Sequence, residues 1–129
     1  MGFATSGYYK QLVVDNISDY KAETNPDMKE CILRNIISRA YYTMLLHCRD
    51  NCKTASTTQY TDGSHERIIK SVRKGSIRTL LLMHKSFRVK ADYHTDTHVG
   101  MPLVNLHGTQ IWPDNILAQM NHILKDDCH

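Results

Sequence analysis

Proline, glycine and long apolar runs are all scarce in this chain of 129 residues. Three prolines and six glycines leave long stretches free of the residues that break helices. No run approaches the ~20 apolar residues that cross a bilayer, and the first residues lack the apolar block of a secretion signal. The sequence therefore predicts an intracellular, cytoplasmic protein with no membrane partner.

The chain also lacks any pair of cysteines in a CxxC arrangement, although it contains four cysteines. This absence removes the strongest zinc and redox signatures, so we expect free thiols, no metal centre and no cofactor. With 41% apolar residues, the chain can build one hydrophobic core but is too short for two ordinary domains. Residues 1–129 are accordingly expected to form a single domain.

Helical periodicity dominates the stretches between the glycines and prolines. In the first segment Val13 and Ile17 fall on one face together with Tyr9 and Tyr20. A second helix is predicted from Pro26 to about residue 51, with Asn25 as its N-cap and Pro26 at the first helical position. Its apolar surface is wide, which is typical of a central helix: Ile32, Leu33, Ile36, Ile37, Ala40, Met44 and Leu45.

Three shorter helices are expected in the second half of the chain. One runs from residue 63 or 64 through Arg73, and the last begins near Pro113. Residues 92–112 carry little helical period and are predicted to be a long loop. The expected fold is all-α, a single four- to five-helix bundle with a long loop before the last helix. The remaining helix opens at Gly75 and Ser76, with a buried stripe of Leu80, Met83, Phe87 and Ala91.

Acidic residues are missing from positions 67–91, which hold eight of the 16 lysines and arginines. A charge run is commonly a solvated helical face, but such faces usually interleave acids for i,i+4 pairing. An unpaired positive field attracts phosphates. We therefore predict that a polyanion, for which RNA is the candidate, contacts this segment through Lys70, Arg73, Lys74, Arg78, Lys85 and Lys90.

Arg88 and His94 form the most informative pair in the sequence. Arg88 shares a helical line with Leu81 and His84, so it should emerge at the edge of the buried face. His94 comes at or just past the end of that helix. A guanidinium grips phosphate oxygens, and an imidazole moves protons near neutral pH. By spacing alone, the same pair also fits an arginine at a helix C-terminus and an ordinary loop histidine.

Cleavage of RNA by its own 2′-hydroxyl requires a base, an acid and a cation, and no metal. One Arg88 and His94 pair supplies a single proton-transfer group. A two-fold homodimer would supply two such groups across one interface. This requirement links the pair to an endoribonuclease reaction and to a homodimer.

Three motifs accompany the pair: "SRAYYTMLLHCRD" (38–50), "GSHERIIKSVR" (63–73) and "FRVKADYH" (87–94). Their order resembles that of the HEPN superfamily of small helical bundles, over about residues 30–95. The shared positions are Ser38, Ala40, Tyr41 and Tyr42 in the first motif, Gly63 and His65 in the second, and Arg88, Ala91, Asp92 and Tyr93 in the third. The residue after the arginine, polar in that family, is Val89 here.

The resemblance implies a metal-independent endoribonuclease that acts as a homodimer and leaves 2′,3′-cyclic phosphate and 5′-hydroxyl ends. It implies a toxin–antitoxin or antiviral-defence context, with an antitoxin or defence protein as a possible partner. Relatives that have lost the histidine serve as binding modules, so the alternative is a catalytically silent module for a nucleotide or partner protein. The implied catalytic residues are Arg88 and His94, supported by Ser38, Tyr42, His65, Asp92 and Tyr93.

The tyrosine pair and His65 leave several roles open. Adjacent helical residues point about 100° apart, so we expect the ring of one tyrosine to pack inside and one hydroxyl to bond near the Arg88 and His94 site. His65 fits equally a position beside a helix N-cap and a phosphate contact. A third hypothesis is a metal-dependent phosphohydrolase, because Asp92, His94, Asp96 and His98 alternate along the predicted loop.

Overall fold

Five helices make up the part of the chain that the structure describes. The computed structural model describes residues 6–51, 64–93 and 113–125. The predicted all-α bundle is confirmed, and residues 94–112 of the predicted loop lie outside the described residues. The helices are α1 (Ser6–Ala22), α2 (Pro26–Asn51), α4 (Ser64–Ser71), α5 (Gly75–Tyr93) and α6 (Pro113–Leu124).

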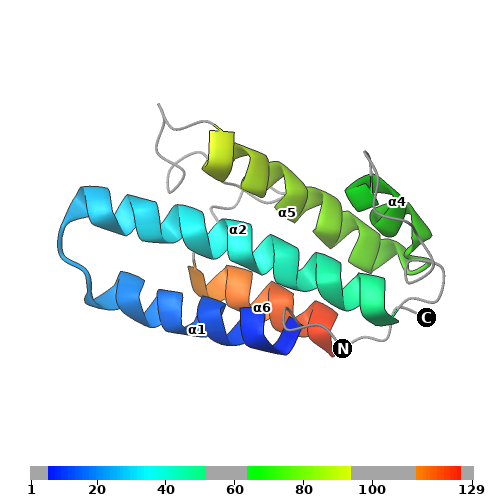
Figure 1. The fold of residues 1–129 in the computed structure, drawn as a ribbon, viewed down its shortest axis with the longest axis horizontal. Coiled ribbons are helices and arrows are strands. Elements are labelled where there is room, and N and C mark those ends of the chain that lie inside the picture. Colours follow the sequence, from blue (N-terminus) through cyan, green and yellow to red (C-terminus); the bar gives the residue numbers. More distant parts are fainter. Residues whose placement is uncertain (1–5, 52–63, 94–112, 126–129) are drawn as a thin grey trace.

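Helix α2 is the central element, as its wide apolar surface predicted. It packs against each of the other four helices. Figure 1 shows α1 and α6 along one side of α2, and α5 with the short α4 along the other. The neighbouring helices α1 and α5 run antiparallel to α2 in this view. One long helix therefore provides the platform on which the rest of the bundle is assembled.

The start of α2 follows the predicted capping chemistry. Asn25 Oδ1 accepts hydrogen bonds from the backbone N–H groups of Asp27 at 2.9 Å and Met28 at 3.1 Å. These two donors have no partner within the helix, so the side chain replaces the missing carbonyls. Pro26 occupies the first helical position, where its lack of an N–H costs nothing. The helix boundary is thus a local property of the sequence.

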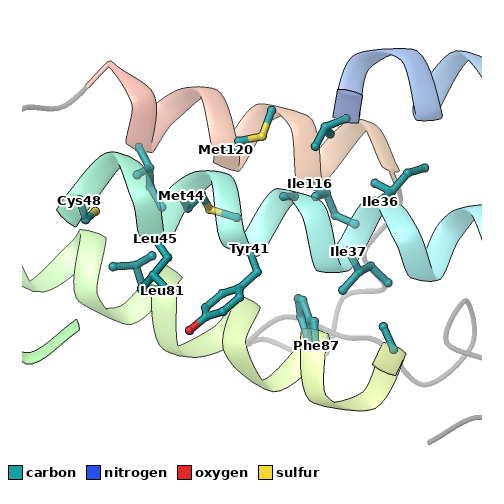
Figure 2. Packing of buried hydrophobic residues seen from close by; sticks show 14 of the residues in the cluster. Ile36, Ile37, Tyr41, Met44, Leu45, Cys48, Leu81, Phe87, Ile116 and Met120 are labelled. Atoms are coloured by element: carbon teal, nitrogen blue, oxygen red, sulfur yellow. The ribbon is translucent and has the colours of Figure 1, made fainter. Parts of the chain in front are cut away.

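The core lies on both sides of α2. Figure 2 shows Met44 of α2 near Met120 of α6, while Tyr41 lies between α2 and α5 near Leu81. Removing these side chains from water supplies the main favourable term for folding. Fifteen of the buried hydrophobic residues belong to α2, α5 and α6: Leu33, Ile36, Ile37, Ala40, Tyr41, Met44, Leu45, Cys48, Ile77, Leu81, Phe87, Ala91, Ile116, Met120 and Ile123.

The buried stripe of α5 differs in part from the predicted one. Phe87 and Ala91 are buried as expected, but Leu80 and Met83 are only half-buried. The stripe instead contains Ile77, Leu81 and His84. Because Leu80, Leu81 and Leu82 are all apolar, the periodicity alone does not decide which side of the helix faces α2, and packing does.

Two helix boundaries also differ from the prediction. Helix α5 continues to Tyr93, so Asp92 and Tyr93 are helical and do not belong to the loop predicted from residue 92. Helix α4 ends at Ser71, two residues before the expected end at Arg73. The two additional helical residues of α5 place Asp92 one turn after Arg88, on the same side of the helix.

Candidate functional site

The C-terminal end of α5 is fixed to α2 by Arg34. The guanidinium Nη1 of Arg34 donates hydrogen bonds to the backbone oxygens of Lys90 at 3.2 Å and Ala91 at 2.8 Å. Carbonyls in the last turn of a helix have no partner within the helix, so a cation there is favourable. Arg34 also pairs with Glu30 on its own helix, at 3.4 Å. The end of α5 that carries Arg88 is therefore held in place.

Arg88 lies at the rim of the core, where the sequence placed it. Its side chain is 17% exposed. Nη2 donates a hydrogen bond of 2.7 Å to the Tyr42 hydroxyl, and Nε lies 3.1 Å from Asp92 Oδ2. The second contact is an ion pair only, because the Nε–H is not aligned for a hydrogen bond. Among the described residues, the polar partners of the guanidinium are Tyr42 and Asp92.

Aromatic rings and a hydroxyl complete the surroundings of Arg88. The guanidinium carbon lies 5.3 Å from the ring centroid of Tyr42 and 5.5 Å from that of Tyr93. Ser38 Oγ donates to Asp92 Oδ2 at 3.3 Å. Burial acts to lower the pKa of Arg88, but Tyr42, Asp92 and Tyr93 outweigh it and raise the pKa overall. The arginine therefore carries a permanent charge on an oriented side chain.

The two adjacent tyrosines divide their roles as expected. Tyr41 is fully buried, and burial raises the pKa of its phenol, so the hydroxyl keeps its proton. Tyr42 is half-buried and places its hydroxyl on Arg88. Their rings meet edge to face with centroids 5.4 Å apart. The prediction of one ring packed inside and one hydroxyl bonded near the arginine is confirmed.

His65, at the start of α4, joins the same cluster. Its Nδ1 lies 3.3 Å from the Tyr41 hydroxyl, and its ring centroid lies 5.5 Å from that of Tyr42. Burial lowers the pKa of His65, and the charges of Arg88 and Lys85 lower it further. The lowered pKa therefore favours the neutral imidazole near pH 7. His65 therefore lies beside the arginine cluster, at the start of α4.

The basic residues of positions 67–91 differ in their contacts and do not form one uniform surface. Arg78 donates from Nε to the Val72 oxygen at 3.1 Å and from Nη2 to the Arg73 oxygen at 3.3 Å, so it holds the turn between α4 and α5. Lys70 pairs with Glu66 at 3.7 Å, one residue before the segment that lacks acids. Both partners are well exposed, and such a pair contributes little. Arg73 and Lys74 are exposed in that turn.

Lys85 and Lys90 lie together in a different place. Both line a hollow of about 360 Å³ on α5, and Leu82, Ser86 and Val89 are the other described residues that line it. Lys85 also lies close enough to His65 to affect its pKa. The predicted RNA-binding residues thus fall into two groups, one at the turn between α4 and α5 and one along α5.

Six of the seven predicted site residues come together. Ser38 and Tyr42 come from α2, His65 from α4, and Arg88, Asp92 and Tyr93 from α5. The seventh, His94, lies outside the described residues, as do Asp96 and His98 of the metal hypothesis. Within the described parts of the chain, no three potential ligands are grouped to hold a metal ion.

Sequence reasoning missed two features of the site. Arg34 was not singled out, and nothing local distinguishes it from the other basic residues of α2. One of the two adjacent tyrosines was expected in the core, but the bond between Tyr41 and His65 was not foreseen. Both features join different helices. The bonds of Arg34 join residues 56 and 57 positions apart in the sequence, and the bond of Tyr41 joins residues 24 positions apart.

Comparisons with protein families, with curated proteins and with solved structures found no match for this chain. None of the helices in the described ranges combines the length and the apolar character that crossing a bilayer requires. The fold and the site therefore define a small all-helical domain with an arginine, tyrosine and histidine cluster where α2, α4 and α5 meet.

Proposed function

We propose that this protein is a metal-independent endoribonuclease of the HEPN kind. The observation that carries the proposal is the meeting of Arg88, Tyr42 and His65 from three helices, at the end of α5 that leads to His94. The side chains of all three HEPN-like motifs converge there, although the motifs lie far apart in the sequence. A surface arginine without a role would not require this set of partners.

In the proposed reaction the 2′-oxygen of the substrate attacks the adjacent phosphorus. The bond from phosphorus to the 5′-oxygen breaks, which leaves a 2′,3′-cyclic phosphate and a 5′-hydroxyl. A base takes the proton of the 2′-hydroxyl, and an acid gives a proton to the leaving 5′-oxygen. His94 is the proposed acid or base, and Arg88 stabilises the charge on the phosphorus oxygens through Nη1.

The other members of the cluster have supporting roles in this proposal. Tyr42 and Asp92 orient the guanidinium, and Ser38 holds Asp92. Tyr93 lies against the guanidinium. His65 is a neutral imidazole beside Tyr42, with Tyr41 fixing its ring. Lys85 and Lys90 along α5, and Lys70, Arg73 and Lys74 near the turn before it, attract the RNA backbone, whose binding should weaken with salt.

The test is cleavage of labelled single-stranded RNA by the purified full chain in the presence of EDTA. We expect cleavage by the wild type, with cyclic phosphate ends, and a loss of roughly a hundredfold or more in Arg88→Ala and in His94→Ala. Arg88→Lys keeps the charge but not the fork geometry, so it should also be impaired. Circular dichroism of each variant checks that the bundle is folded.

Lys21→Ala is the matched control, because Lys21 forms an exposed ion pair with Asp114 away from Arg88. Its cleavage rate should equal that of the wild type. A wild type that cuts no RNA after removal of any bound partner would overturn the nuclease proposal. Unchanged RNA binding by Arg88→Ala and His94→Ala would then favour a catalytically silent binding module.

The proposal includes a homodimer and a regulating partner. A two-fold pair of sites would bring two copies of His94 to one RNA, and sedimentation equilibrium measures this association. A co-expressed antitoxin or defence protein is the proposed restraint on activity, and co-purification would identify it. RNA is the proposed substrate with or without such a partner.

A further inference from the structure

Tyr42 also lines a second hollow, next to the Arg88 site. The described residues that line this cavity of about 340 Å³ are Tyr9 of α1 and Arg39, Tyr42, Leu46 and Arg49 of α2. The four α2 residues follow each other at spacings of three and four, so they lie along one side of the helix. Tyr42 therefore links the Arg88 site to a separate pocket between α1 and α2.

The walls of this pocket combine cations, phenol rings and one aliphatic side chain. The Arg39 guanidinium carbon lies 5.9 Å from the ring centroid of Tyr9. Arg49 is already paired with Asp50, with Nε 2.8 Å from Oδ1 and Nη2 3.3 Å from Oδ2. That carboxylate offsets much of the charge of Arg49. Among the described residues no carboxylate pairs with Arg39, so Arg39 is the principal cation of the pocket.

We propose that the pocket formed by Tyr9, Arg39, Tyr42, Leu46 and Arg49 binds one nucleotide of single-stranded RNA. The base stacks on a tyrosine ring and packs on Leu46, and the phosphate binds Arg39. Base stacking on aromatic rings tolerates every base, and arginine binds phosphate oxygens in a fork. The cavity volume falls in the range of small-molecule sites.

The position of the pocket matches the proposed reaction. Arg88 binds the Tyr42 hydroxyl, while the Tyr42 side chain also lines the pocket. A nucleotide in the pocket would lie beside the phosphate that Arg88 holds, and would fix the position of the strand for cleavage. The identification of the occupant as RNA rests on the proposed function, whereas the pocket and its charge do not.

The experiment measures binding of 5′-AMP, adenosine and inorganic phosphate to the full chain by titration calorimetry. We expect 5′-AMP to bind more tightly than either fragment. Arg39→Ala and Tyr9→Ala should each weaken 5′-AMP binding roughly tenfold, and Tyr9→Phe should retain it because the ring is kept. Lys21→Ala, a charge loss at a remote ion pair, should bind as the wild type does.

Three results would overturn the pocket proposal. These are no binding of 5′-AMP by the wild type, equal binding by Arg39→Ala and Tyr9→Ala, and binding of phosphate alone as tight as that of 5′-AMP. The last result would identify an anion site without a base contact. Circular dichroism shows that the two alanine variants are folded before they are compared.

RNA cleavage separates this proposal from the nuclease proposal. With an active wild type, Arg39→Ala should raise KM roughly tenfold and leave kcat unchanged, because the pocket contributes binding away from the reacting bond. An active enzyme that does not bind 5′-AMP would overturn the pocket alone. A wild type that binds 5′-AMP in the pocket but cuts no RNA would overturn the nuclease proposal alone.

Discussion

At the scale of single residues, the position of Arg88 explains how a charged group can be held at the edge of a core. Only 17% of its side chain is exposed, so its guanidinium requires polar partners. Tyr42 and Asp92 provide them from two directions. A group held in this way loses little freedom when it binds a phosphate, which favours stabilisation of a transition state.

Tyr42→Phe tests this orientation directly. The substitution keeps the ring and removes the hydroxyl that accepts from Arg88 Nη2 at 2.7 Å. We expect RNA cleavage to fall roughly ten- to hundredfold in kcat, the effect of losing a hydrogen bond to a charged group. Single-turnover cleavage assays measure the change.

Tyr8→Phe is the matched control for this substitution, because Tyr8 is 68% exposed on α1 and does not line the site. It should cleave RNA at the wild-type rate. If Tyr42→Phe also cleaved at that rate, Tyr42 would have no role in orienting the arginine, whatever the role of Arg88 itself.

At the scale of single elements, the ends of the helices depend on a few local bonds. Asn25 satisfies two backbone donors at the start of α2, and Arg34 satisfies two backbone acceptors at the end of α5. The Asn25 bonds join residues two or three positions apart in the sequence, whereas the Arg34 bonds join residues more than fifty positions apart. The start of α2 is therefore encoded locally, and the docking of the end of α5 depends on the assembled bundle.

Asn25→Ala should lower the free energy of unfolding by about 1 kcal/mol, because the cap is lost while the donors remain. Urea denaturation followed by circular dichroism measures the change. Asn25→Ser should recover most of the stability. Asn35→Ala removes an exposed asparagine from the interior of the same helix, and should be neutral or slightly stabilising. A similar loss in both alanine variants would show that Asn25 does not act as a cap.

At the scale of the whole molecule, a buried polar contact connects the two sides of the bundle. His84 of α5 is fully buried, and its Nε2 lies 2.6 Å from Gln119 Oε1 of α6. Burial lowers the pKa of His84 to about 4, and the bond to Gln119 opposes the shift only in part. The folded protein therefore keeps this imidazole neutral, and charging it opposes folding.

This burial predicts how stability depends on pH. Between pH 6.5 and about 4 the unfolded chain binds a proton at His84 that the folded chain does not bind, so stability falls as the pH falls through that range. The loss from this one group is about 3 kcal/mol. Urea denaturation at several pH values measures the slope of the unfolding free energy against pH. His84→Gln should reduce this slope.

His122→Gln on α6 is the control for that slope, because His122 is exposed. Its pH dependence should match that of the wild type. If His84→Gln left the slope unchanged, another group would be responsible for the loss of stability in acid. His84→Gln also changes the packing, so the dependence of stability on pH reports the protonation of His84, and the absolute stability does not.

The sequence by itself determined the helical class, the cap at Asn25, the start of α6 at Pro113, the burial of much of α2, and the placement of Arg88 at a rim. These features depend on a residue's neighbours within one or two helical turns, and periodicity and capping chemistry report them. Only the tertiary structure decided that Arg88 binds Tyr42, that His65 bonds Tyr41, and that Arg34 holds the end of α5. Those contacts depend on how each helix is rotated and docked, which is set by the packing of the whole core.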